Sequence, residues 1–158
     1  MKELKDIQLF VYDFDGVMTD NKVIVDENGK EAVVCNRSDG LAVQLIREMG
    51  IGQLIISTER NEVVKRRAEK LKLEVVNNVS DKRYCLQEYC QKHAIDMQTV
   101  LFIGNDLNDK EVMEACGYSV CPSDSAPEIK EIATFITICK GGEGVIRELY
   151  TKLRNEYS

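Results

Sequence analysis

Short apolar runs alternate along the chain with longer stretches in which apolar side chains recur every three or four residues. The β-branched and aromatic character of the short runs predicts strands, at residues 7–12, 52–57, 74–76, 99–103, 118–121 and 135–138. The periodic stretches predict helices that end near residues 50, 71, 93, 116, 132 and 155. Because strands and helices alternate, we expect a doubly wound α/β fold, with a mostly parallel sheet covered on both faces. We expect a single domain that spans residues 1–158.

One segment departs from this alternation, between the first strand and the first helix. Two β-rich runs, residues 22–26 and 31–36, flank Glu27-Asn28-Gly29-Lys30, where Asn-Gly suits the positive φ angles of a tight turn. They predict a β-hairpin at about residues 22–36, projecting beside the carboxyl end of the first strand. Ser38 is the expected N-cap of the helix that follows.

Composition and charge argue against several classes of partner. The chain has 158 residues, of which 44% are hydrophobic and 30% charged, as in an ordinary soluble domain. Its net charge of -6 argues against binding nucleic acid or an anionic membrane surface. The N-terminus does not resemble a signal peptide and no apolar run is long enough to span a bilayer, so we expect a cytoplasmic protein. Six cysteines without a Cys-x-x-Cys pair, and a single histidine, give little support for a structural zinc site.

The first predicted strand ends in two carboxylates, Asp13 and Asp15, followed by Gly16. The chain leaves strand geometry at the glycine, so both carboxylates can reach one crevice beyond the strand. Mg²⁺ prefers such oxygen ligands and would relieve the repulsion between them. Asp13 could then attack phosphorus as a nucleophile, while Asp15 acts as general acid and base. An Asp-rich turn explains the same residues equally well on local grounds.

Other polar residues follow the second and fourth predicted strands or begin a helix. They are Ser57 and Thr58, Lys82, and the acidic loop that contains Asn105, Asp106 and Asp109. In open parallel sheets ligands bind beyond the carboxyl ends of the strands, so we expect these residues to meet the first two carboxylates. Each also has a structural alternative: Ser57 as a helix cap, Lys82 as a solvated surface residue, and the two aspartates as turn and N-cap residues.

Taken together and in this order, the four motifs resemble those of the haloacid dehalogenase superfamily of phosphotransferases. The resemblance covers nearly the whole chain. It implies that Asp13 is the nucleophile and that Asp15 is the general acid/base, whose backbone carbonyl also binds Mg²⁺. It further implies that Ser57 donates a hydrogen bond to a phosphoryl oxygen and that Lys82 neutralises the nucleophile and the phosphate.

The acidic loop departs from the family's pattern at Asn105, where the family usually has an aspartate that binds the metal. An amide oxygen can coordinate Mg²⁺, but the site then carries one negative charge fewer and should bind the ion more weakly. We expect either a lower activity or compensation by Asp106, which could contact the metal or its waters. Asp109 and Gly16 are expected to support the site.

The absence of an insertion large enough for a cap domain makes the chain similar to the capless branch of the superfamily. That branch includes 3-deoxy-D-manno-octulosonate 8-phosphate and nonulosonate 9-phosphate phosphatases, of sialic acid or lipopolysaccharide biosynthesis. The hairpin, Asn36, Asp39 and the segment 141–148 carry this resemblance. It implies a homotetramer in which a neighbouring subunit closes the active site.

Within the branch, Glu59, Arg67 and Lys70 resemble substrate-binding residues of the nonulosonate phosphatases, the two cations coming from the adjacent subunit. Arg67 and Lys70 are three residues apart and share a helix face, although a solvated basic face explains them as well. Thr58 replaces a glycine that these enzymes usually carry, and Asn36 and Asp39 complete the expected substrate contacts.

Two functional hypotheses result. The first is a Mg²⁺-dependent phosphomonoesterase that removes the terminal phosphate of a keto-deoxy sugar acid, with nonulosonate 9-phosphate favoured and octulosonate 8-phosphate next. The second is a weakly active or inactive oligomerisation module, because the C-terminal domain of animal sialic-acid cytidylyltransferases also resembles this branch and has Asn in its acidic loop. The joint presence of Asp13, Asp15, Lys82 and Asp109 favours the enzyme.

Overall fold

Six parallel strands form the central sheet of the computed structural model, which describes residues 4–158. The strands lie in the order β5-β4-β1-β6-β7-β8. Their bounds are β1 Leu9–Tyr12, β4 Gly52–Ile56, β5 Glu74–Val76, β6 Val100–Ile103, β7 Tyr118–Cys121 and β8 Phe135–Ile136. The six predicted strands are therefore present, and the last is shorter than expected. Because β1 pairs with β4 on one side and β6 on the other, the residues after β1 lie at the middle of the sheet's carboxyl edge.

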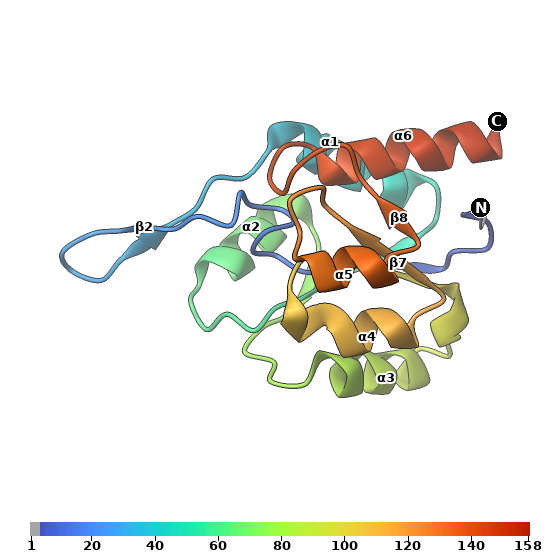
Figure 1. Ribbon diagram of the computed structural model, residues 1–158, viewed down its shortest axis with the longest axis horizontal. Helices are drawn as coiled ribbons and strands as arrows, with labels where there is room; N and C mark the ends of the chain where they lie inside the picture. The colour runs from blue at the N-terminus through green and yellow to red at the C-terminus, as the bar shows by residue number, and fades with distance from the viewer. Residues whose placement is uncertain (1–3) are drawn as a thin grey trace.

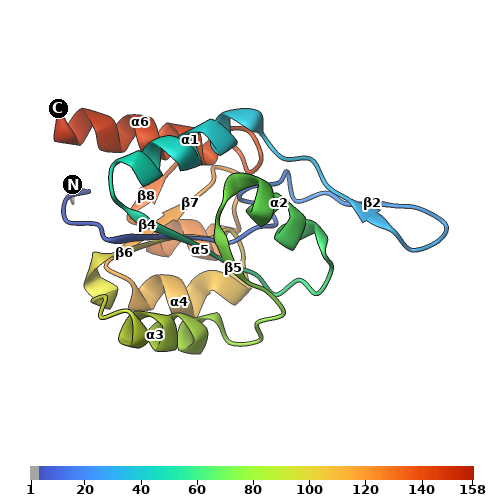
Figure 2. The ribbon, with the colours of Figure 1, turned by 180° about the vertical axis from the view of Figure 1, so that it is seen from behind.

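Helices cover both faces of this sheet (Figures 1 and 2). One face carries α1 Arg37–Glu48, α2 Val63–Leu71 and α6 Val145–Tyr157, and the other carries α3 Lys82–Lys92, α4 Lys110–Ala115 and α5 Pro127–Ile132. Each face has its own apolar core, and the strands between them are buried on both sides, which explains their continuous apolar runs. The expected doubly wound fold is confirmed. Within residues 4–158, no helix combines the length and the apolar character needed to cross a bilayer.

Side-chain caps fix where two of these helices begin. The N-cap of α1 is Asn36, whose Oδ1 accepts a hydrogen bond from the Ser38 N–H at 2.8 Å, so the expectation that Ser38 is the cap was wrong. Asp81 caps α3 by accepting from the Tyr84 N–H at 2.9 Å. Lys82 is therefore the first residue of α3, where a cation opposes the helix dipole.

The predicted hairpin is present and projects from the body of the molecule (Figure 1). Its paired part, β2 Ile24–Val25 with β3 Glu31–Ala32, is shorter than the expected runs. An isolated bridge between Thr19 and Cys35 closes its base. Only the hairpin and α1 separate β1 from β4, so no cap domain is inserted there.

The segment before α6 packs against the loop that follows β1. A Cβ atom on Gly141 would lie 2.0 Å from the Gly16 carbonyl oxygen, so only glycine permits this approach. The Gly142 N–H donates to the Val17 carbonyl at 3.0 Å, and the Gly141 N–H donates to Asp124 Oδ1 at 3.0 Å. The C-terminal part of the chain thereby supports the turn that contains Gly16.

Asp39 is buried between α1 and α6, with only 3% of its surface exposed. Its Oδ1 accepts a hydrogen bond from the Arg147 N–H at 3.0 Å, which caps α6 from outside because Gly144 has no side chain to do so. Its Oδ2 has no hydrogen-bond partner. Burial raises the pKa of Asp39 from 3.8 to about 6, although the backbone N–H groups of Arg147 and Ile146 lower it.

The raised pKa predicts how stability depends on pH. The folded protein binds a proton at Asp39 more tightly than the unfolded chain does, so protonation of Asp39 adds to the free energy of unfolding. This stabilisation is complete below pH 3.8 and is lost as the pH rises through about 6. We expect Asp39→Asn to remove this loss of stability at higher pH, because an asparagine does not ionise. Relative to wild type, the variant should gain up to about 3 kcal/mol in free energy of unfolding between pH 4 and pH 7.5. Urea unfolding at both pH values measures the gain, and the surface substitution Asp6→Asn is the control that should show none.

Candidate active site

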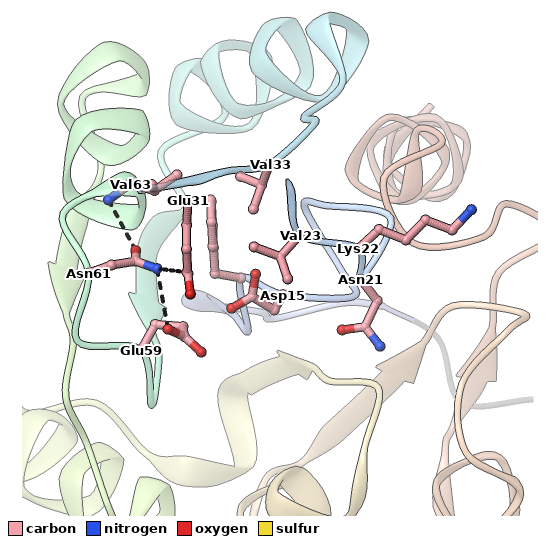
Figure 3. A pocket seen from close by; sticks show the side chains of 10 residues that line it. Asp15, Asn21, Lys22, Val23, Glu31, Val33, Glu59, Asn61 and Val63 are labelled. Carbon is pink, nitrogen blue, oxygen red and sulfur yellow. Dashed lines mark hydrogen bonds between the residues drawn. The ribbon is translucent and has the colours of Figure 1, made fainter. Parts of the chain in front are cut away.

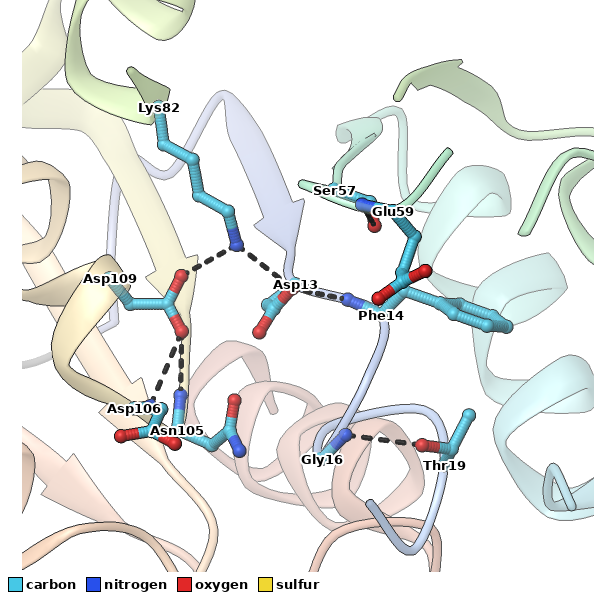
Figure 4. Close-up of polar contacts among 10 residues, drawn as sticks. All are labelled: Asp13, Phe14, Gly16, Thr19, Ser57, Glu59, Lys82, Asn105, Asp106 and Asp109. Atoms are coloured by element: carbon cyan, nitrogen blue, oxygen red, sulfur yellow. Dashed lines mark hydrogen bonds and ion pairs between the residues drawn. The ribbon is translucent and has the colours of Figure 1, made fainter. Parts of the chain in front are cut away.

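The carboxyl ends of three neighbouring strands bring the predicted polar residues together. Asp13 and Asp15 follow β1, Thr58 and Glu59 follow β4, and Asn105 and Asp106 follow β6. All six line one cavity of about 140 Å³, which Asn21 and Asn108 complete. Ser57 lies beside it and is 1% exposed, and its Oγ accepts a hydrogen bond from the Glu59 N–H at 3.1 Å (Figure 4).

Lys82 reaches this edge of the sheet from the start of α3. Its Nζ donates to Asp13 Oδ1 at 2.9 Å and to Asp109 Oδ1 at 2.7 Å, and all three side chains are almost fully buried (Figure 4). The dipole penalty of a lysine at this helix position is thus offset by two carboxylates. The structure excludes the alternative that Lys82 is a solvated surface residue.

The three buried groups perturb one another's protonation. Burial and the Asp109 carboxylate raise the pKa of Asp13, while Lys82 lowers it. Burial alone lowers the pKa of Lys82, but Asp13 and Asp109 outweigh it and raise that pKa above the usual value. The short contacts of Lys82 are those of an ammonium group with carboxylates, so Lys82 favours the ionised form of Asp13.

Asp15 has an environment that suits proton transfer. Burial raises its pKa first, and the carboxylates of Glu59 and Glu31 raise it further. A raised pKa favours the protonated carboxyl group, which is the form that can donate a proton to a leaving group.

Asp109 organises the acidic loop. Its Oδ2 accepts from the Asn105 N–H at 3.0 Å and from the Asp106 N–H at 3.4 Å. Asp106 caps the short 3₁₀ helix Leu107–Asp109, and its carboxylate also lines the cavity. Its role as a cap therefore does not exclude a role at the cavity.

Three oxygens converge in a way that fits a hard divalent cation. The side-chain oxygen of Asn105 faces Asp13 Oδ2 at 2.9 Å and the Asp15 backbone oxygen at 3.0 Å. Adjacent ligands in an octahedron with Mg–O distances of about 2.05 Å are about 2.9 Å apart. Within residues 4–158, no three His, Cys, Asp or Glu side chains form a group that could hold a metal ion. Of the three converging oxygens, one belongs to an amide and another to a main-chain carbonyl.

A second cavity, of about 200 Å³, lies between Asp15 and the base of the hairpin (Figure 3). Asn61 holds two of its carboxylates: its Nδ2 donates to Glu31 Oε2 at 2.7 Å and to Glu59 Oε2 at 3.4 Å. Asn21 and Lys22 also line it. Sequence reasoning missed Asn61, Glu31, Asn21, Lys22 and Asn108. The predicted position of the hairpin, beside the carboxyl end of β1, was the one indication that Glu31 and Lys22 could lie near the site.

Four predicted substrate-binding residues do not line either of the two cavities described above. Arg67 and Lys70 line a groove between α1 and α2, where Arg67 Nη2 donates to the Asn36 carbonyl at 3.3 Å. Asn36 caps α1 and Asp39 caps α6, so both have a structural role, and their contact with a substrate stays a prediction.

Comparison with known proteins identifies the family. Residues 3–149 match the family model of haloacid dehalogenase-like hydrolases. The 3-deoxy-D-manno-octulosonate 8-phosphate phosphatase of Salmonella typhi is 30% identical over 150 residues, which are 94% of this chain and 80% of that protein.

Solved structures agree. A protein from Streptomyces avermitilis described as a HAD family hydrolase superposes with a TM-score of 0.94 at 36% identity, over 97% of this chain and 88% of that one. The Moraxella catarrhalis 3-deoxy-D-manno-octulosonate 8-phosphate phosphatase was solved with magnesium, phosphate and KDO. It superposes with a TM-score of 0.93 at 27% identity, over 97% of this chain and 88% of that one. The expected kinship is confirmed: this chain belongs to the haloacid dehalogenase-like hydrolases.

Proposed function

We propose that the protein is a Mg²⁺-dependent phosphomonoesterase that releases the terminal phosphate of a keto-deoxy sugar acid. The observation that carries the proposal is the placement of Asp13, which contacts Lys82 on one oxygen and faces Asn105 and the Asp15 carbonyl with the other. The names of the phosphatases to which the chain is similar support the substrate class.

The chemistry uses the two aspartates in turn. The Asp13 carboxylate attacks phosphorus, the bond to the leaving oxygen breaks, and Asp15 gives that oxygen a proton, which yields the alcohol and an aspartyl-phosphate. A water molecule then attacks phosphorus while Asp15 takes its proton, and inorganic phosphate leaves Asp13 as a carboxylate. Lys82 balances the charge of the nucleophile, and the Ser57 hydroxyl donates to a phosphoryl oxygen.

Asp13, Asn105 and the Asp15 carbonyl would hold Mg²⁺, with Asp106 contacting the ion or its waters. When bound, Mg²⁺ supplies positive charge to the phosphoryl oxygens.

The cavity beside Asp15 is suited to the hydroxyl groups of a sugar chain. Glu31 and Glu59 are acceptors fixed by Asn61, and they would repel a carboxylate. Lys22 is one cation at this cavity, and Arg67 and Lys70 of a second copy are our candidates for the others that the acid group of the substrate needs. This use of Glu59 with two cations favours nonulosonate 9-phosphate, whereas the named relatives support octulosonate 8-phosphate.

We also propose that the protein is a homotetramer. The hairpin exposes apolar side chains on a projecting segment, with Val23 52%, Ile24 65%, Val25 58% and Val34 57% exposed. Such a cluster is typical of a surface that is covered by another chain. A neighbouring copy packed on the hairpin would also close the open side of the active site and exclude water.

Charging this surface should break the assembly. We expect Ile24→Asp to sediment as a smaller species than wild type and to lose most of its activity toward the sugar acid phosphate, because the neighbour no longer completes the site. Ile138→Asp is the matched control, since Ile138 is 90% exposed and lies outside the hairpin. A tetramer that persists with Asp at position 24 would contradict the proposal.

A panel of phosphate esters tests the function. Phosphate release is measured with nonulosonate 9-phosphate, octulosonate 8-phosphate, a hexose 6-phosphate and p-nitrophenyl phosphate, each with Mg²⁺ and with EDTA. We expect Mg²⁺-dependent turnover of a sugar acid phosphate at least about a hundredfold above the hexose ester. Equal and feeble release from all four would remove the substrate assignment, and no release at all would favour the oligomerisation module.

A further inference from the structure

Asn105 is the point at which the acidic loop meets the loop after β1. Its side-chain oxygen lies 2.9 Å from Asp13 Oδ2 and 3.0 Å from the Asp15 carbonyl oxygen. Three acceptor oxygens at these distances repel one another unless a cation or a hydrogen-bond donor lies among them. Turning the amide over places Nδ2 at the same distances from the same two oxygens, as a donor to both.

Asparagine can meet both requirements, whereas an ionised aspartate can bind the cation but cannot donate a hydrogen bond. The side-chain amide offers an oxygen for a cation on one side and two N–H donors on the other, whereas an ionised carboxylate only accepts. An aspartate at this position would add a third acceptor and a negative charge next to Asp13.

The surroundings hold Asn105 so that rotation of its amide is the movement left to it. The residue is 7% exposed. Its N–H donates to Asp109 Oδ2 at 3.0 Å, and its carbonyl accepts from the Ala126 N–H at 3.0 Å. On the other side Gly16, at φ 83°, leaves space for the amide, because a Cβ there would lie 2.0 Å from Asn105 Nδ2.

We propose that Asn105 serves the site in two ways: its NH₂ group bonds Asp13 and the Asp15 carbonyl when the cation is absent, and its oxygen faces the cation when it is bound. Binding must then break two hydrogen bonds and meets one negative charge fewer than in a site with aspartate. Asn105 thus stabilises the metal-free protein and lowers its affinity for Mg²⁺. The cation site therefore fills at a higher Mg²⁺ concentration than a site with aspartate would. The inference rests on the proposed function only in requiring a divalent cation at this place.

The substitution Asn105→Asp tests the proposal on protein stripped with EDTA, with Mg²⁺ alone as the probe. We expect the metal-free variant to melt roughly 5 °C below wild type. We expect its dissociation constant for Mg²⁺, measured by calorimetry, to fall at least about tenfold. The rise in melting temperature on adding Mg²⁺ should therefore be larger in the variant.

Asn108→Asp is the matched control, because Asn108 lines the same cavity and the substitution adds the same charge. We expect Asn108→Asp to change the melting temperature of the metal-free protein and the dissociation constant for Mg²⁺ by less than half as much as Asn105→Asp does. On wild type, titration with Mg²⁺ should shift the side-chain amide resonances of Asn105, identified by their absence in the variant. An unmoved amide resonance, or an Asn105→Asp protein with wild-type stability and affinity, would overturn the proposal even if sugar phosphates are hydrolysed. If none is hydrolysed, these readouts still decide it.

Discussion

Asp13→Asn is expected to keep the fold and to lose at least about a thousandfold in the rate of phosphate release. The amide cannot attack phosphorus, and it offers one oxygen where the carboxylate offers two, one toward Lys82 and one toward Asn105. Folding should survive because Lys82 keeps its contact with Asp109 at 2.7 Å.

The measurement is phosphate release at saturating Mg²⁺, with the melting temperature recorded for each protein. Asp96→Asn provides the control. Asp96 precedes β6, at the opposite edge of the sheet, and an asparagine can still accept the hydrogen bond from the Gln98 N–H. A protein that retains a tenth of wild-type activity without the Asp13 carboxylate would exclude it as the nucleophile.

Lys82→Met should damage both stability and activity. It leaves Asp13 and Asp109 buried, at 6% and 0% exposure, without the cation that both contact. Removing one partner of such a buried group of charges costs about 3 to 5 kcal/mol in free energy of unfolding. Two carboxylates without the cation also bind protons more tightly, so the loss should be smaller at pH 5 than at pH 8.

Two further variants separate the effects of Lys82 on folding and on chemistry. Lys92→Met makes the same change at the exposed end of the same helix and should be nearly neutral. Adding Asp109→Asn to Lys82→Met removes one buried charge and should recover stability without recovering turnover. Wild-type stability of Lys82→Met at pH 8 would show that the buried charges are balanced in another way.

Much of the fold and of the site's position could be predicted because it follows from chain-local patterns. Buried strands have continuous apolar runs, and the carboxyl ends of parallel strands meet at one edge, so Asp13, Ser57 and Asn105 had to lie near one another. Lys82 could be singled out because its position in the helix is unfavourable on local grounds alone.

The residues that could not be predicted depend on contacts between distant segments. Asn61 and Glu31 meet only because the hairpin folds over the loop after β4. Asp39 looked like a binding residue, but α6 covers it and uses it as a cap. Asn36 was passed over as the cap of α1 because Ser38, two residues later, is an equally good capping residue type.

The contact of Gly141 with the Gly16 carbonyl brings two segments that are far apart in the sequence together at the turn after β1. The turn that follows Asp13 and Asp15 can therefore reach its final position only after the chain has been synthesised past residue 142.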